Sequence, residues 1–190
     1  MTMLILGLAV FIAIHIVPTQ RDIRAGGVAR FGEGGYKGLF SLVAFVGLFL
    51  IVYGLGQARY AVSGNPQLWM PPPWTRHATM TLMLPVFILL AAAAYLPGRI
   101  SAAVKHPMLL SVKLWAFAHL LISGRLAQLL LFGGLLAWAV FDRISVKRRG
   151  VAIKTGPARN DVIAVVIGLA AYVFMLKWGH ALLIGVPLIF

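Results

Sequence analysis

Histidine offers the clearest chemistry in this sequence of 190 residues, which contains five histidines and no cysteine. Without cysteine the chain has no thiolate metal site, iron–sulfur cluster, disulfide or thiol nucleophile, so imidazole becomes the leading candidate for metal ligation. The sequence also lacks a glycine-rich phosphate loop and a clear Ser-His-Asp set, which disfavours hydrolase and nucleotide-driven pump chemistry. The candidates are His15, His77, His106, His119 and His180.

Long apolar blocks carry these histidines. Hydrophobic residues make up 61% of the chain and the mean hydropathy is +0.94, which argues against a water-soluble domain. About 18 apolar residues in helical form cross the roughly 30 Å of bilayer hydrocarbon. We therefore expect an all-α fold, a polytopic membrane bundle of about six transmembrane helices that forms a single domain over residues 1–190. The expected spans are Met3 to Val17, Leu39 to Gln57, His77 to Leu96, Pro107 to Ser123, Leu126 to Phe141 and Asp161 to Trp178.

The basic residues predict an orientation for these spans. The connections at residues 18–38, 97–106 and 142–160 hold four, two and six Lys and Arg, against four on the opposite side. The positive-inside rule then puts both termini outside the cytoplasm. The net charge of +13 is explained by this topology, so we expect the lipid bilayer as partner and no nucleic acid.

The depth of each histidine limits which pairs can act together. His106 and His119 are thirteen residues apart on one predicted helix, roughly 20 Å, so one haem iron cannot take both. His77 and His119 lie toward the outer leaflet, whereas His15 and His106 lie toward the cytoplasm. Either pair is a candidate clamp for haem between helices, and each histidine can instead simply hydrogen-bond a backbone carbonyl or a headgroup. Trp115, one turn before His119, shares its helical face.

Three further polar residues have expected roles. Lys113, near the middle of the fourth span, either extends its stem toward the cytoplasmic side or pairs with a buried anion such as a haem propionate. Asp142 is expected to pair with Arg143 at the end of the fifth span. Asp161 is expected to cap the first turn of the sixth span by accepting backbone N–H bonds.

Several stretches together resemble the NnrU family, over roughly residues 4–149. They include the segments that hold His15, His106 and His119 and a glycine-rich stretch before the second span. The stretches are His15 to Pro18, Arg21 to Arg24, Arg30 to Leu42, Leu68 to Trp69, Pro71 to Trp74, Arg76 to His77, Leu96 to Arg99, Lys105 to Leu110, Lys113 to Trp115 and Ala118 to Leu121.

The resemblance implies a multi-pass protein of the bacterial inner (plasma) membrane, linked to denitrification and nitric oxide metabolism. A related enzyme, 15-cis-zeta-carotene isomerase, carries haem b, and its ligands correspond to His15 and His119, while its haem-linked cysteine falls at Ala116. The candidate metal ligands are therefore His119, His15 and His77. His106 and Lys113 are the further candidates for cofactor binding.

Three functions follow as hypotheses. In the first, histidines from different helices hold one haem b beside an apolar cleft that admits a gas or a lipid-soluble polyene, whose double bond would be isomerised. In the second, the chain is a non-enzymatic accessory factor for nitric oxide reductase components, and its histidines are structural. In the third, it is a membrane methyltransferase that uses S-adenosylmethionine, because Lys105 to Pro107 resembles the Arg-His-Pro motif of isoprenylcysteine-type methyltransferases.

Overall fold

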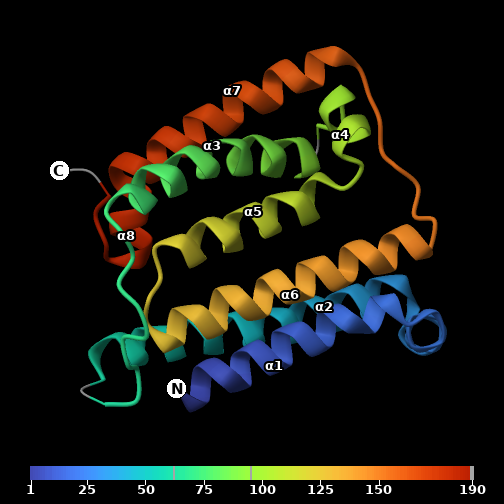
Figure 1. Ribbon diagram of the computed structural model, residues 1–190. Coiled ribbons are helices and arrows are strands. Elements are labelled where there is room, and N and C mark those ends of the chain that lie inside the picture. Colours follow the sequence, from blue (N-terminus) through green and yellow to red (C-terminus); the bar gives the residue numbers. More distant parts are fainter. Residues whose placement is uncertain (62, 95, 189–190) are drawn as a thin grey trace. The chain divides into compact units, whose positions relative to one another are not determined.

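The computed structural model describes residues 1–190 except 62, 95 and 189–190, and it is built from helices (Figure 1). The predicted all-α class is confirmed: the described residues form no β-strand, only an isolated bridge between Gln67 and Arg125. In chain order the elements are α1 (Thr2–Ile16), the 3₁₀ turn η1 (Val17–Thr19), α2 (Arg21–Tyr60), α3 (Trp74–Ala94), α4 (Arg99–Val104), α5 (Pro107–Leu121), α6 (Leu126–Arg148), α7 (Ala158–Phe174), the π-helical η2 (Met175–Gly179) and α8 (His180–Ile184).

Five helical segments of the described chain are long and apolar enough to cross a membrane. They correspond to five of the six predicted spans, and the last one runs without interruption through η2 and α8, from Ala158 to Ile184. The remaining span, α5, has 15 residues and a length of roughly 22 Å, shorter than the hydrocarbon core. The chain is a multi-pass membrane protein, while the count of six and the orientation stay predictions.

Most of the first predicted connection, residues 18–38, is helical rather than loop. Helix α2 covers 40 residues and is interrupted at Gly32, whose φ of 71° and ψ of 166° are non-helical. A side chain disfavours this backbone conformation strongly, so glycine is the residue that permits the break. The segment before the break carries Arg21, Arg24 and Arg30, and the segment after it carries Lys37 and the apolar span.

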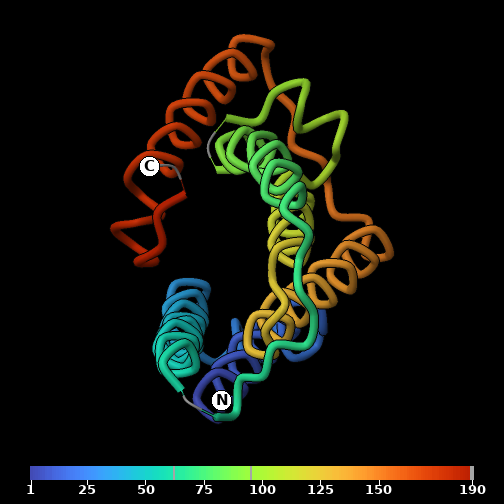
Figure 2. Tube along the Cα trace, turned by 60° about the vertical axis from the view of Figure 1, so that its left-hand side comes forward, coloured from blue at the N-terminus to red at the C-terminus, as the bar shows by residue number. Residues whose placement is uncertain are grey.

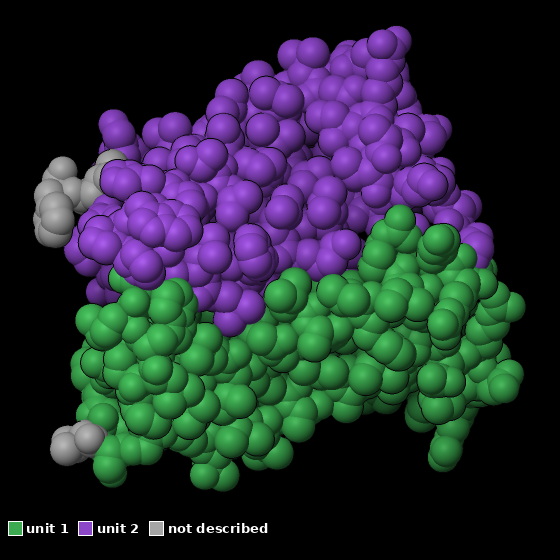
Figure 3. Space-filling view, in the orientation of Figure 1, with its two compact units in different colours: residues 1–71, 123–149 green, residues 72–122, 150–190 purple. Residues whose placement is uncertain are grey.

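The described chain divides into two compact units, which Figure 3 colours separately. Unit 1 consists of residues 1–71 and 123–149 and contains α1, α2 and α6. Unit 2 consists of residues 72–122 and 150–190 and contains α3, α4, α5, α7, η2 and α8. Within unit 2, α3 packs against both α5 and α7 (Figures 1 and 2).

Glycines allow α1 and α2 to pack backbone to backbone in unit 1. A Cβ at Gly7 would lie 2.6 Å from the amide nitrogen of Ile51, and one at Gly47 would lie 2.9 Å from that of Phe11. A Cβ at Gly54 would collide with the backbone of Leu4, which is fully buried. Small residues at such positions are how membrane helices approach closely, because lipid offers no hydrophobic force to press them together.

Asn65 joins the end of α2 to the start of α6. Its amide nitrogen donates to the carbonyl of Ala58 at 3.1 Å, and its side-chain oxygen accepts from the backbone N–H of Ala127 at 2.8 Å. The cap residue of α6, Arg125, makes no side-chain hydrogen bond to the helix. Asn65 therefore satisfies an N–H at the start of α6 that would otherwise lack a partner.

The glycine contact in unit 1 gives a direct test. Gly54→Ala is expected to lower the free energy of unfolding by about 1–3 kcal/mol, because the new Cβ meets rigid backbone rather than a flexible side chain. Gly56→Ala is the matched control, since a Cβ there meets nothing within 4 Å. Thermal unfolding in detergent measures both, and equal midpoints would contradict the packing described.

Candidate functional site

His15 lies near the end of α1 among aromatic rings from the three helices of unit 1. Its Nδ1 lies 2.7 Å from the carbonyl oxygen of Phe11, one turn earlier. The ring centroid is 4.1 Å from that of Phe11, 5.1 Å from that of Phe40 on α2 and 5.1 Å from that of Trp138 on α6. The imidazole is half-buried, so these rings shield it from one side without enclosing it.

His119 repeats this arrangement near the end of α5 in unit 2. Its Nδ1 lies 2.8 Å from the carbonyl oxygen of Trp115, and the Trp115 ring centroid is 5.3 Å away. Trp115 and His119 thus share one face of α5, as their spacing predicts. The sequence argument left His180 in an unassigned tail because the π-helical turn that continues the span has no clear sequence signal.

The shared geometry determines which nitrogen of each ring can bind a ligand. A carbonyl oxygen only accepts hydrogen bonds, so Nδ1 in both rings carries the proton, and the neutral ring presents Nε2 as its lone-pair donor. Histidines that bind metals usually have this arrangement, with the non-ligating N–H donated to a backbone carbonyl or a carboxylate. His15 and His119 are thus oriented as ligands through Nε2, although the same hydrogen bond also suits a purely structural histidine.

Trp138 adds an unusual feature beside His15. Its indole Nε1 is buried and has no hydrogen-bond partner among the described residues. Its ring stands nearly perpendicular to that of His15, at 74°. A buried donor without a partner costs roughly 1–3 kcal/mol, so such groups call for an explanation. Sequence reasoning missed Trp138, because only the packing of α6 against α1 brings it to His15.

The other predicted site residues have different surroundings. His77 is exposed in the first turns of α3, and the Thr79 hydroxyl donates to the carbonyl of Ala118, so this part of α3 lies against the end of α5 that carries His119. This agrees with the depth argument, but among the described residues His77 has no backbone hydrogen bond like the one that orients the other two rings. Lys113 is half-buried in α5, and no ion pair of the described residues includes it.

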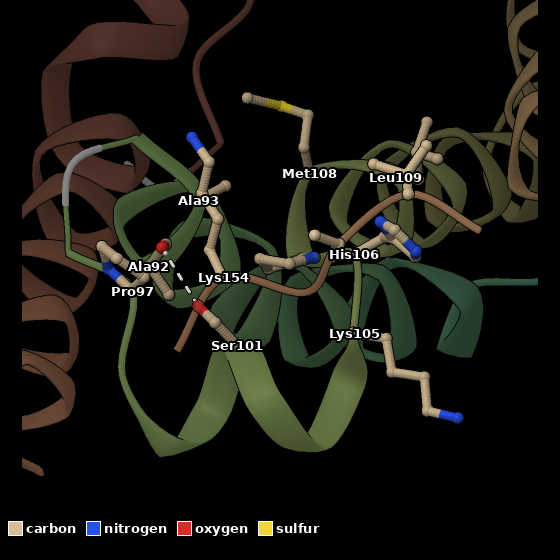
Figure 4. Close-up of a pocket in the computed structure, with 12 residues that line it drawn as sticks. Ala92, Ala93, Pro97, Ser101, Lys105, His106, Met108, Leu109 and Lys154 are labelled. Atoms are coloured by element: carbon tan, nitrogen blue, oxygen red, sulfur yellow. Dashed lines mark hydrogen bonds between the residues drawn. The ribbon is translucent and has the colours of Figure 1, made fainter. Parts of the chain in front are cut away.

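His106 lines a cavity of about 220 Å³ at the junction of α3, α4, α5 and the segment after α6 (Figure 4). Lys105, just before it, has a φ of 68°, and the His106 N–H donates to the carbonyl of Val104 at 2.9 Å. This is a tight γ-turn, a rare and strained conformation. The turn ends α4 and places His106 at the start of α5, on the wall of the cavity and away from His119.

Two predicted roles of acidic residues are wrong. Asp161 accepts the backbone N–H groups of Arg99 and Ile100, both at 3.0 Å, so it caps α4 instead of the helix α7 in which it lies. A Cβ at Gly98 would collide with its carboxylate, which explains a glycine there. Asp142 pairs at 3.4 Å with Arg149, the C-cap residue of α6 about two turns farther along, rather than with Arg143.

No group of three or more His, Asp or Glu side chains in the described part of the chain could hold a metal ion by itself.

Apolar helices of spanning length, with few polar groups among them, define the chain as a multi-pass helical membrane protein. The protein belongs to the NnrU protein family, whose model matches residues 3–188. The match extends the resemblance seen in the sequence through α7 and α8, and so includes His180. No curated protein and no solved structure matches the chain.

The cap formed by Asp161 can be tested independently of function. Asp161→Ala is expected to lower the free energy of unfolding by about 0.5–2 kcal/mol, because two N–H groups at the start of α4 lose their acceptor. Asp22→Ala, at an exposed position in the first turn of α2, is the control. Thermal unfolding in detergent should separate the two variants, and an unchanged Asp161→Ala would refute the cap.

Proposed function

We propose that this NnrU-family membrane protein binds haem b through histidine, and that His15 in unit 1 and His119 in unit 2 are the two candidate ligands, each argued from its own surroundings. The observation that carries the proposal is their shared geometry: both rings donate Nδ1–H to the carbonyl four residues earlier and both lie against an indole. These are also the two positions that the resemblance to 15-cis-zeta-carotene isomerase implies. His119 is common to this resemblance and to the pair of His77 and His119 that the depth argument allows.

The surroundings of His15 fit a flat, apolar prosthetic group. Phe11, Phe40 and Trp138 supply the aromatic surface that a porphyrin packs against, and the buried Nε1–H of Trp138 supplies a donor that lacks an acceptor within the described protein. Haem would contribute an iron centre able to bind a small gas such as nitric oxide or to transfer electrons. The chain itself would orient the imidazoles, exclude water and hold the macrocycle.

Ala116 occupies the position of the isomerase's cysteine, and this limits which side chains could ligate the iron. Ala116 is fully buried in α5, and the chain contains no cysteine, so no thiolate can replace histidine on the iron. The proposal is therefore a histidine-ligated haem protein of nitric oxide metabolism or denitrification, with polyene isomerisation as the alternative reaction. A methyltransferase site at His106 has less support, because the cavity there is below the usual 300–1,000 Å³ of small-molecule sites.

Absorption spectra of the purified protein test the ligands. After haem-replete expression, the wild type should show a Soret band that shifts on reduction, and the haem content should fall strongly in His119→Ala and in His15→Ala. His77→Ala, which removes an exposed histidine of unit 2, should keep its haem. A wild type without a Soret band would refute the proposal and favour the accessory-factor hypothesis, particularly if a reductase component copurified. Loss of haem in His77→Ala would instead favour the pair of His77 and His119.

Trp138 gives a second test that separates a cofactor contact from packing. Trp138→Phe keeps an aromatic ring but removes the N–H, so haem release to an acceptor protein should become about threefold to tenfold faster through loss of one hydrogen bond. The haem-free variant should be no less stable than the wild type, because it no longer buries an unpaired donor. Trp178→Phe, at an exposed indole, is the control. Unchanged haem release would remove Trp138 from the site.

A further inference from the structure

The cavity beside His106 combines an apolar wall with basic side chains. Ala92, Ala93, Met108 and Leu109 supply apolar surface from α3 and α5, and Leu109 is almost fully buried. The basic residues are Lys105, His106 and Lys154, and none of the described residues that line the cavity is acidic. In Figure 4 the Lys105 side chain extends away from the other lining residues, and the Ser101 hydroxyl donates to the carbonyl of Ala92.

The backbone adds to the positive potential. Helix α5 begins at Pro107 without a side-chain cap, so the N–H groups of its first turn, including those of the lining residues Met108 and Leu109, have no partner within the helix. These N–H groups carry the positive end of the helix dipole. The first turn of α5 thus presents both apolar side chains and backbone N–H donors to the cavity beside His106.

The segment that carries Lys154 is held at the cavity by its own contacts. Residues 151–157 are not helical, and a Cβ at Gly156 would collide with the carbonyl of Pro97. The Asn160 side chain donates to that same carbonyl at 2.8 Å. Pro97 itself lines the cavity, so these contacts fix the segment against the loop before α4. The Lys154 side chain is exposed, but the contacts of Gly156 and Asn160 with Pro97 hold the segment that carries it.

We propose that this cavity binds the phosphate group of an anionic membrane phospholipid. Its volume of about 220 Å³ suits a headgroup phosphate and adjoining glycerol better than a whole cofactor. The cavity lies at the start of the apolar helix α5, and Met108 and Leu109 of its first turn line it. The site is separate from His15 and His119 and does not depend on haem.

Lipid binding to the full-length protein in detergent tests this proposal. Short-chain phosphatidylglycerol should bind more tightly than phosphatidylcholine with the same tails, as counted by native mass spectrometry. Lys154→Gln should weaken phosphatidylglycerol binding by about fivefold, the usual contribution of one lysine to an anionic membrane surface. Lys154→Arg should restore it. The matched control is Lys147→Gln, which removes the same charge from an exposed position on α6 and should have no effect.

A second variant tests the cavity rather than the charge. Ala93→Leu fills the space while leaving every basic residue in place, so it should abolish the preference for phosphatidylglycerol. Equal binding of the two lipids, or equal effects of Lys154→Gln and Lys147→Gln, would overturn the proposal. Inorganic phosphate forms the remaining arm: if it competes as strongly as the lipid, the site takes a free anion and the assignment to phospholipid is wrong.

Discussion

Hydrocarbon cannot form hydrogen bonds, so every polar group of the backbone in this protein must find its partner within the chain. Helix interiors meet this requirement by themselves, and the ends of helices do not. The chain solves the problem with side chains that are distant in sequence: Asn65 serves the start of α6, and Asp161 serves the start of α4. The indole of Trp69 donates to the carbonyl of Ser123 in the same way. Asp161 and Asn65 thus stabilise the starts of α4 and α6.

Close helix packing follows from the same solvent. Because lipid is as apolar as leucine, α1 and α2 gain stability from shape and contact rather than from removal of water. Gly7, Gly47 and Gly54 let the two backbones approach. Gly47 meets the backbone of Phe11, whose ring packs with that of Phe40 against the imidazole of His15. The close contact of the two helices thus extends to the aromatic cluster.

The sequence alone predicted the apolar helices and singled out His15 and His119 as candidates. It did not predict most of the residues that contact the polar side chains. Hydropathy predicts an apolar helix from local composition alone, which is why the spans were found. The partners of Asp161 and Asp142, and the position of Trp138 beside His15, depend on which helices pack together, and composition carries no such information. The helix that replaces the expected loop before Gly32 was missed because its glycine-rich, basic composition is typical of a connection.

The hydrogen bond from Nδ1 to the carbonyl of the preceding turn holds the imidazoles of His15 and His119 in a fixed orientation relative to their own helices. In His15 the acceptor is the backbone of Phe11, which itself belongs to α1, so the imidazole cannot turn without breaking a bond to its own helix. A rotation of α1 by a few degrees would therefore move Nε2 together with the helix. A ligand bound to Nε2 would be displaced by the same movement. The reverse also holds, because strain at the ligand would be transmitted directly to the axis of the helix.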